Sequence, residues 1–305
     1  MAQLIKLKDY ISRYEWNAYR YPSQYIRLKQ EKWEKLYHAW LEREHMMDEE
    51  PVSDKKRFHF SKFKFFTKSN DEPDDMITSA DLLPTTEVEL RHYFLNQLMP
   101  FQIRWATSTV TDVSLTDKDY QYDDTLKYFL QRFPDIYLLM YYPIFHIKNT
   151  PIDGEIILIG PFGIEVIHLL EFKEEAIILA GDERTWQVEI EDKKETIISP
   201  LISLKRTEHI IKRILNTEQI NFPVRKVVLS RTNHIHFSSE PYQTMIIGKF
   251  QHDEWFKEKR GLKSSLKGNQ LKVIEALLKY CLTTSMKRPE WDENLNVMMD
   301  DREEF

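Results

Sequence analysis

The sequence predicts an α/β domain with a mixed central sheet flanked by helices, together with a helical N-terminal appendage. Residues 151–172 read PIDGEIILIGPFGIEVIHLLEF, with two apolar runs, 155–159 and 163–172, separated by Gly and Pro. Runs rich in Ile and Val that end at such residues indicate two β-strands joined by a tight turn. Because few charges interrupt them, we expect both strands to be central and covered on each face. Helical and strand patterns on either side indicate a sheet packed between helices.

Three regions are expected along the chain: a helical, aromatic N-terminal region (1–80), the α/β domain (81–287) and a polar, acidic tail (288–305). Residues 1–47 are expected to be helical, with Pro22 at the first position of an amphipathic helix that carries Trp33 and Trp40. This apolar stripe indicates packing on the main body, and a partner-binding helix is the alternative. Basic and aromatic residues alternate in 57–68, as in a nucleic-acid surface or in an arm that covers the domain.

The α/β domain begins with an expected helix in which Thr86 is the N-cap and Glu89 completes a capping box. Pro100 is expected to end this helix, and 101–110 to form a strand. A second helix is expected after Asp123 or Asp124, followed by a long strand over 136–147. Pro143 within that run indicates a bulge or an edge position.

The second half of the domain is expected to contain a meander, 176–179 and 185–190, and then a helix capped by Ser199 with Pro200 in its first turn. Strands over 224–230 and 245–248 and helices over 251–259 and 268–282 complete the predicted elements. Residues 233–236, which include His234 and His236, are expected to form a loop, because an isolated His-x-His is weak evidence for a metal site.

Composition excludes several classes of protein. The chain has 305 residues with 42% hydrophobic and 30% charged residues, which is ordinary for a globular protein. The single cysteine, Cys281, excludes an internal disulfide. No signal-peptide pattern and no apolar run of roughly 18 residues occurs, so we expect a cytoplasmic protein without a membrane partner. The formal net charge of −6 argues against strong non-specific DNA binding but leaves room for a local basic groove.

An ordered set of features then suggests a family. It comprises the turn Gly160-Pro161-Phe162-Gly163, the β run after it, a hairpin with Trp186, the Ser199-Pro200 helix start and the strand over 224–230. This order resembles the nuclease-related domain, NERD, over about residues 85–250. That resemblance implies the PD-(D/E)xK restriction-endonuclease-like fold.

The resemblance also implies positions for a metal-dependent active site. The family carries an acidic residue eight positions before the second glycine of the turn, which falls on Glu155 here. Its Glu-x-Lys motif falls on His168 and Leu170, so one carboxylate is replaced by imidazole and the lysine is absent. Such enzymes hold Mg²⁺ or Mn²⁺ with carboxylates, and the metal activates water. The lysine places a fixed positive charge beside the reacting water, and losing one such stabiliser costs roughly 10²–10³ in rate.

Neighbouring residues could restore the site. Glu171 and Lys173 spell Glu-x-Lys, but strand alternation points them to the other face unless a bulge intervenes. Asp153 would join Glu155 and His168 as a metal ligand if its strand begins early, while the pair Asp153-Gly154 otherwise indicates a hairpin turn. Other possible acidic contributors lie on the preceding helix, namely Glu87 and Glu89.

Three functions remain open from the sequence. The first is a nuclease-fold protein with impaired or lost metal-dependent cleavage, acting as a DNA- or protein-binding module. DNA would contact the helix after Ser199 through its basic residues, Lys205, Arg206, Lys212 and Arg213. The second is an active Mg²⁺- or Mn²⁺-dependent nuclease that uses Glu155 with displaced partners. The third is a protein-interaction module unrelated to DNA, which would use the aromatic N-terminal helices.

Overall fold

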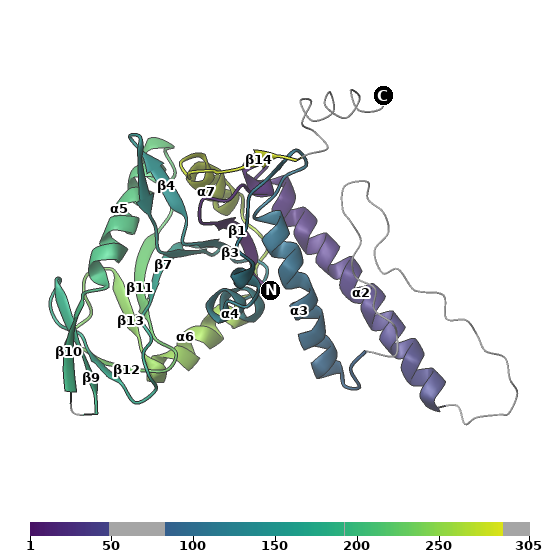
Figure 1. The fold of residues 1–305 in the computed structure, drawn as a ribbon, viewed down its shortest axis with the longest axis horizontal. Coiled ribbons are helices and arrows are strands. Elements are labelled where there is room, and N and C mark those ends of the chain that lie inside the picture. The colour runs from purple at the N-terminus through teal and green to yellow at the C-terminus, as the bar shows by residue number, and fades with distance from the viewer. Residues whose placement is uncertain (49–82, 192, 289–305) are drawn as a thin grey trace, which may run out of the picture. The chain divides into compact units, whose positions relative to one another are not determined.

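The fold comes from a computed structural model that describes residues 1–48, 83–191 and 193–288. These residues form two compact units, Met1–Pro22 with Gln102–Phe305, and Ser23–Phe101 (Figure 1). The division differs from the expected boundaries after residues 80 and 287. The aromatic segment 57–68 and nearly all of the tail lie outside the described residues.

The larger unit is built on a six-stranded mixed sheet, which confirms the predicted class of fold. Its strands, in spatial order, are β1 (Gln3–Leu7), β3 (Leu138–Tyr141), β6 (Ile156–Ile159), β7 (Ile164–Leu169), β11 (Val224–Leu229) and β13 (Thr244–Ile247). The two predicted strands, β6 and β7, occupy the centre and pair antiparallel. The amide of Gly160 donates to the carbonyl of Gly163, 2.9 Å away, which closes the turn between them.

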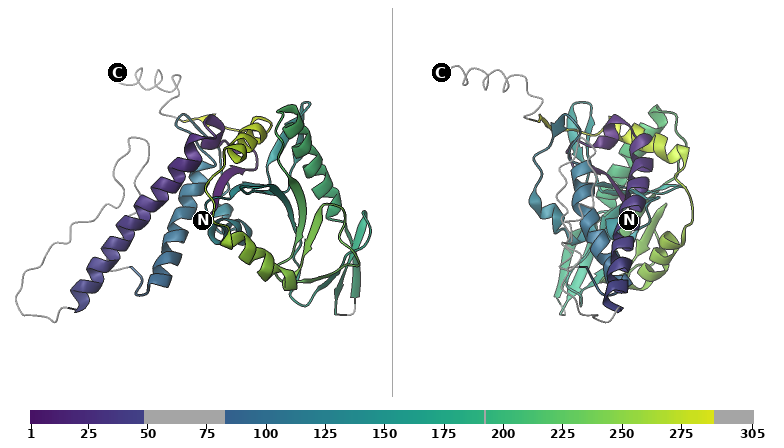
Figure 2. Two further views of the ribbon diagram at one scale, coloured as in Figure 1. Left: turned by 180° about the vertical axis from the view of Figure 1, so that it is seen from behind. Right: turned by 90° about the vertical axis from the view of Figure 1, so that its right-hand side faces the viewer.

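Helices cover both faces of this sheet. Helix α5 (Leu201–Thr217) packs on β7 and β11 and lies beside α7 (Gly268–Lys279). Helix α6 (Lys249–Gly261) reaches β7 from the opposite face, where Lys259 binds Glu165 at 2.5 Å, and α4 (Asp124–Arg132) packs near β3. Figures 1 and 2 show α5 on one side of the sheet and α6 on the other. Alternation along β7 therefore decides which helix each side chain meets.

A second sheet of four strands flanks the first. Its spatial order is β10 (Lys193–Ile198), β9 (Thr185–Ile190), β8 (Ile177–Leu179) and β12 (His234–His236). The predicted antiparallel meander is confirmed by the pairing of β8 with β9, and Trp186 is buried. The loop expected over 233–236 is wrong, because β12 pairs parallel with β8.

The smaller unit contains most of two helices, α2 (Arg20–Asp48) and α3 (Glu87–Trp105). Its core joins Leu36 and Trp40 to Leu83 and Leu90, with Trp33 among the partly buried side chains packed against it. The predicted tryptophan stripe therefore has a packing role within this unit. The amide of Glu89 donates to the hydroxyl of Thr86 at 3.3 Å, as the predicted cap requires.

Prolines misled the prediction at two places in the first half of the chain. Helix α3 runs through Pro100 to Trp105, so the end at Pro100 and the strand over 101–110 are wrong. The long strand over 136–147 is instead two strands, β3 and β4 (Ile144–Ile147), which belong to different sheets. Between them Tyr142 takes a φ of 47°, which turns the chain just before Pro143.

Capping residues explain two further helix starts. Asp123 is the N-cap of α4, and its carboxylate accepts from the amides of Thr125 and Leu126 at 2.9 Å each. At α5 the helix begins after Pro200, and the hydroxyl of Ser199 accepts from the amide of Leu201 at 3.4 Å. The short elements are α1 (Arg13–Trp16), β2 (Asp112–Val113), a 3₁₀ helix (Lys118–Gln121), β5 (Thr150–Asp153) and β14 (Met286–Lys287). None of the described helices combines the length and the apolarity that a bilayer span needs.

Candidate functional site

Glu155 and His168 lie opposite one another at the end of the central hairpin. The register pairs Ile156 with Ile167, and one step further along it joins Glu155 to His168. Their side chains meet, with 3.1 Å between Oε1 of Glu155 and Nδ1 of His168. Two of the three positions implied by the family resemblance are therefore in contact.

Helix α5 completes the surroundings of this pair. The hydroxyl of Ser203 lies 3.2 Å from Nδ1 of His168, and the hydroxyl of Thr207 accepts from the amide of Glu155 at 3.2 Å. Burial, the largest influence, acts to raise the pKa of Glu155, and the hydrogen bond and charge of His168 act to lower it. With added contributions from Ser203 and the charge of Arg206, the pKa of this carboxyl falls below its ordinary value. Glu155 is therefore a carboxylate at neutral pH.

Glu155, His168 and Ser203 do not form a nucleophilic triad. In such a triad the acid and the serine bind opposite nitrogens of the imidazole ring, so that a proton can pass through the ring. Here Glu155 and Ser203 both contact Nδ1 of His168. The arrangement fixes the ring and leaves Ser203 without a base on the productive side.

The residues present do not fit a magnesium centre. Leu170, at the position implied for the lysine, is buried, and its amide donates to the carbonyl of Leu229 at 2.8 Å. Asp153 is exposed at the end of β5, where it pairs with Ile144 in a two-stranded hairpin. Within residues 1–48, 83–191 and 193–288 no three His, Cys, Asp or Glu side chains are arranged to hold a metal ion. Asp153, Glu155 and His168 are not brought together as such a group, whereas Mg²⁺ needs several converging oxygens.

The predicted turn at Asp153-Gly154 is also wrong. The hairpin of β4 and β5 turns at Lys148 and Asn149, which have φ values of 49° and 65°. Gly154 serves a different purpose, since a Cβ there would lie 2.9 Å from the carbonyl oxygen of Pro143. Its lack of a side chain lets the chain pass close to β4 before entering β6.

Glu171 and Lys173 do not restore the missing functions. Glu171 binds Arg231 through both oxygens, at 2.6 Å to Nε and 2.7 Å to Nη2. Burial acts to raise the pKa of Glu171, whereas the hydrogen bonds and charge of Arg231 act to lower it, and the net shift is downward. The carboxylate is therefore engaged in a structural pair. Arg231 also lies over the ring of Tyr128, a residue of α4. Lys173 is exposed, and its carbonyl accepts from Asn233.

Two other predicted acids belong to the smaller unit. Glu87 binds Arg91 at 2.5 Å on the surface of α3, and Glu89 takes part in the cap with Thr86. His234 and His236 lie on β12, where the ring of His234 packs on Phe250 with 4.1 Å between centroids. Local packing and capping account for these contacts.

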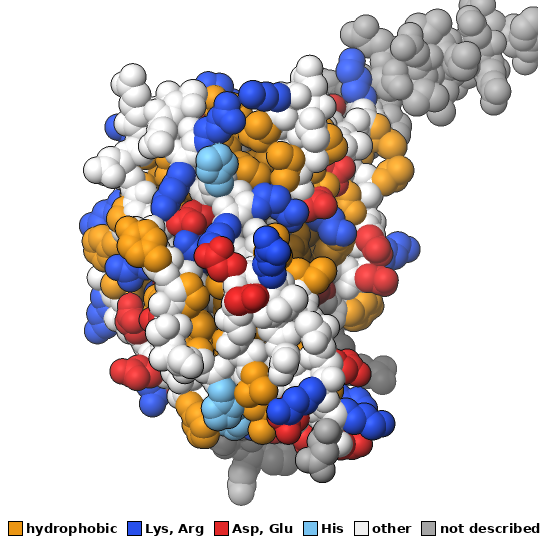
Figure 3. All heavy atoms as spheres, turned by 90° about the vertical axis from the view of Figure 1, so that its left-hand side faces the viewer, with side chains coloured by type: hydrophobic (Ala, Val, Ile, Leu, Met, Phe, Trp, Pro, Cys, Tyr) orange, Lys and Arg blue, Asp and Glu red, His pale blue; other side chains and the backbone are white. Residues whose placement is uncertain are grey.

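The basic residues of α5 divide into two groups. Lys205 forms an ion pair with Glu183, and Lys212 binds Glu208 at 2.8 Å. Arg206 and Arg213 are exposed, as is His209 between them. Their spacing of three and four residues places these three on one helix face. On the side of the molecule that carries α5, basic side chains lie among acidic and apolar ones (Figure 3).

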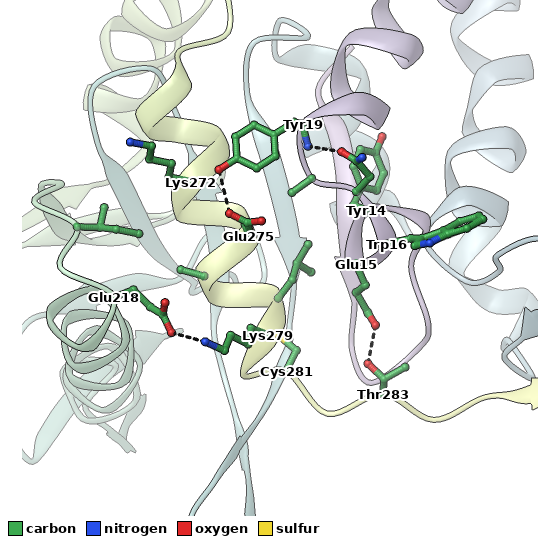
Figure 4. Close-up of a pocket in the computed structure, with 15 residues that line it drawn as sticks. Tyr14, Glu15, Trp16, Tyr19, Glu218, Lys272, Glu275, Lys279, Cys281 and Thr283 are labelled. Atoms are coloured by element: carbon green, nitrogen blue, oxygen red, sulfur yellow. Dashed lines mark hydrogen bonds and ion pairs between the residues drawn. The ribbon is translucent and has the colours of Figure 1, made fainter.

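A pocket of about 880 Å³ lies elsewhere in the larger unit, between α1 and α7 (Figure 4). Its polar groups largely bind one another. The hydroxyl of Tyr19 donates to Glu275 at 2.9 Å, and Lys279 binds Glu218 at 2.8 Å. Thr283 donates to Glu15 at 2.9 Å, and the buried ammonium of Lys6 neutralises the same carboxylate. These pairs connect the N-terminal segment, the end of α5 and the C-terminal part of the unit, and they leave few groups for a ligand.

Comparison with known proteins does not show a family. No protein-family model matches the chain, and no solved structure matches it. A stretch of 40 residues is 55% identical to part of an RNA 2′,3′-cyclic phosphodiesterase of Geobacillus stearothermophilus, which is 13% of this chain and 13% of that protein. Because the chain spans so little of that relative, the likeness does not assign an activity.

Sequence reasoning missed Ser203 and Tyr142 at the site. Ser203 lies beside the apolar stripe of α5. A polar residue at the edge of this stripe is the sequence signal that could have indicated a side chain turned toward the sheet. The positive φ of Tyr142 sets the direction of its side chain. Burial raises the pKa of Tyr142 to about 12, and the negative charge of Glu155 makes a smaller contribution in the same direction. That backbone conformation has no local signature in a Tyr-Tyr-Pro sequence.

Proposed function

We propose that this chain is a nuclease-fold module of the nuclease-related domain type that binds nucleic acid and has lost metal-dependent cleavage. The observation that carries the proposal is the contact of Glu155 with His168 at 3.1 Å. It stands where the resemblance implies two carboxylates around a metal ion.

The chemistry of these residues disfavours hydrolysis. A divalent cation beside a phosphodiester needs anionic oxygens, and neutral imidazole cancels none of its charge. Glu155 already accepts a hydrogen bond in this pair, and the buried side chain of Leu170 offers no positive charge to the reacting water. Losing one transition-state stabiliser costs roughly 10²–10³ in rate, and here both a carboxylate and the lysine are missing.

The exposed face of α5 supports nucleic-acid binding. Arg206 and Arg213 stand on it with His209, while the neighbouring lysines are held by glutamates. Guanidinium groups bind phosphate oxygens with two parallel hydrogen bonds, which suits a sugar-phosphate backbone. The charge of Arg206 also reaches Glu155. The proposed surface therefore starts at the position of the lost active site.

Binding to a fluorescein-labelled DNA duplex, followed by anisotropy across a salt series, tests this surface. Each lost phosphate contact is expected to reduce the slope of log K against log salt by about 0.9, or about eightfold in affinity near 0.1 M salt. We expect Arg206→Ala with Arg213→Ala to lose both contacts, which lowers the slope by about 1.8 and the affinity roughly sixtyfold. Lys205→Ala is the matched control, because Lys205 lies on the same helix as the two arginines but is bound to Glu183. Equal affinities for the double variant, the control and the wild type would remove the proposed surface.

Cleavage is tested separately with supercoiled plasmid in Mg²⁺ or Mn²⁺. We expect no metal-dependent nicking by the wild type and no change with Glu155→Ala. Nicking by the wild type that disappears in Glu155→Ala would show that the site is active and would overturn the proposed loss of catalysis. Because the binding assay contains no metal, its result does not depend on this one.

A further inference from the structure

A second cavity, of about 570 Å³, is lined mainly by tyrosines and aspartates. The tyrosines are Tyr120, Tyr122, Tyr141 and Tyr142, and the aspartates are Asp117, Asp119 and Asp123. Its volume is in the range of small-molecule sites. The walls come from the 3₁₀ helix, the start of α4 and the end of β3, all within the larger unit.

The charge of the lining is negative. Lys8 is the one cationic residue among the eight described residues that line the cavity, against three aspartates. The carboxylate of Asp123 accepts hydrogen bonds from two backbone amides and from the hydroxyl of Tyr141, which lies 2.8 Å away. Asp117 accepts from the amide of Asp119 at 3.0 Å. None of these hydrogen-bond donors is a cation, so the three aspartates are balanced within the lining by Lys8 alone, and the cavity is expected to attract a cation.

The aromatic walls favour the same kind of ligand. The face of a tyrosine ring attracts an ammonium or guanidinium group through its quadrupole. The chain shows this already, since Nζ of Lys8 lies 5.5 Å from the centre of the Tyr120 ring. Tyr141 and Tyr142 stand edge to face with centroids 4.7 Å apart, and Tyr122 is 79% exposed at the rim. Tyrosine rings of different orientation therefore line the same cavity.

Tyr142 is held in this wall against its backbone preference. Its φ of 47° is unfavourable for a residue with a side chain, and such strain persists where the surroundings impose it. Burial, followed by the negative charges of Glu155 and Asp123, raises its pKa to about 12. The hydroxyl therefore stays protonated at neutral pH and remains a donor and acceptor at the cavity wall.

The identity of the cation follows from the same residues. A hard metal ion needs converging carboxylates, and across the part of the chain that the structure describes no such group of three occurs. A cavity of this size with aromatic walls instead suits a larger cation whose charge is spread over carbon-bearing groups. We propose that this cavity binds an organic ammonium ion, held by the tyrosine faces and by the carboxylates of Asp117 and Asp119.

The test uses the full chain and two probes of the same shape. Choline carries the ammonium charge, and 3,3-dimethylbutanol replaces its nitrogen with carbon. Isothermal titration at pH 7.5 is expected to show saturable binding of choline and at least fivefold weaker binding of the alcohol, since the cation–π and charge contributions are lost. Equal binding of the two probes, or no saturable choline binding below roughly 10 mM, would refute the proposal.

Two variants locate the binding to this cavity. Tyr122→Leu removes one exposed ring and is expected to weaken choline binding roughly three- to tenfold, and Asp119→Asn roughly threefold. Tyr242→Leu is the matched control, because Tyr242 is 84% exposed and does not line the cavity. If Tyr242→Leu weakens binding as much as Tyr122→Leu, the binding is non-specific and the assignment fails.

A last comparison distinguishes the source of the ammonium group. Spermidine represents a free amine and N-acetyl-lysine methylamide represents a lysine side chain of a protein. Tighter binding of spermidine supports a small-molecule ligand, and tighter binding of the lysine amide supports a peptide. Failure of both to compete with choline would contradict an ammonium site.

Discussion

The buried ion pair between α5 and β11 offers the sharpest test of how this helix is fixed to the sheet. Nζ of Lys226 lies 2.6 Å from Oε2 of Glu208, and the two side chains are 5% and 11% exposed. Lys212 binds the other oxygen of Glu208 at 2.8 Å, but its own side chain is 44% exposed. Lys226 therefore depends on Glu208 for its counter-charge, whereas Lys212 can return to water.

The perturbation is Glu208→Gln, which keeps the shape and removes the charge. Breaking a buried pair from one side costs about 3–5 kcal/mol, because the other charge stays buried without compensation. The glutamine oxygen can still accept a hydrogen bond from Lys226, so we expect a loss near the lower limit, about 3 kcal/mol. Against a total stability of roughly 5–15 kcal/mol, this is a large fraction. Urea unfolding followed by far-ultraviolet circular dichroism measures it.

Two further variants determine whether charge burial is the reason. Glu208→Gln with Lys226→Met removes both charges, and its stability is expected to return to within about 1–2 kcal/mol of the wild type. Glu183→Gln breaks the exposed pair with Lys205 and is expected to cost at most about 0.5 kcal/mol. A loss below about 1 kcal/mol for Glu208→Gln, or a double variant less stable than the single one, would refute this reasoning.

Acid sensitivity and close packing give two more predictions. Burial acts to raise the pKa of Glu155, but His168, Ser203 and Arg206 together lower it, so its stabilising effect is complete above the unfolded value near 4.5 and disappears as pH falls through the lower folded value. Glu155→Gln should therefore flatten the fall in urea stability below about pH 4.5, and an unchanged acid limb would contradict this. Gly154→Ala is expected to cost roughly 1–3 kcal/mol in thermal unfolding, because its Cβ would lie 2.9 Å from a backbone oxygen of Pro143. Gly261→Ala, with open space around the new methyl group, should cost nothing, and equal losses at both positions would argue against the close approach.

The centre of the fold could be predicted because its signals are local. Strand β6 is apolar throughout, β7 is apolar except for Glu165 and His168, and Gly160 and Gly163 bound them, so length and composition define both strands. Strand β1 could not be predicted in this way. It includes Lys6, which is fully buried and is stabilised by Thr283, 277 residues away in sequence, and by Glu15. A charged residue in a short strand looks exposed until its distant partners are known.

Proline signals failed for a related reason. Helix α3 continues through Pro100 although proline disfavours a helix interior. The residues beyond it are held by tertiary packing, since Trp105 is almost fully buried and meets Tyr14 and Tyr21 edge to face. Packing of this kind outweighs a local preference of a few kcal/mol. The sequence window around Pro100 contains none of these contacts.

The candidate site shows where prediction from sequence stops. The family resemblance suggested Glu155 and His168 as site residues, and the register of β6 and β7 brings them opposite one another, while Glu171 binds Arg231 instead. The role of the pair depends instead on what α5 presents to it. Ser203 contacts the same nitrogen of His168 as Glu155 does, and that geometry excludes a proton relay through the ring. Register therefore determines which side chains of the hairpin meet, whereas the packed helix determines the geometry of their contacts.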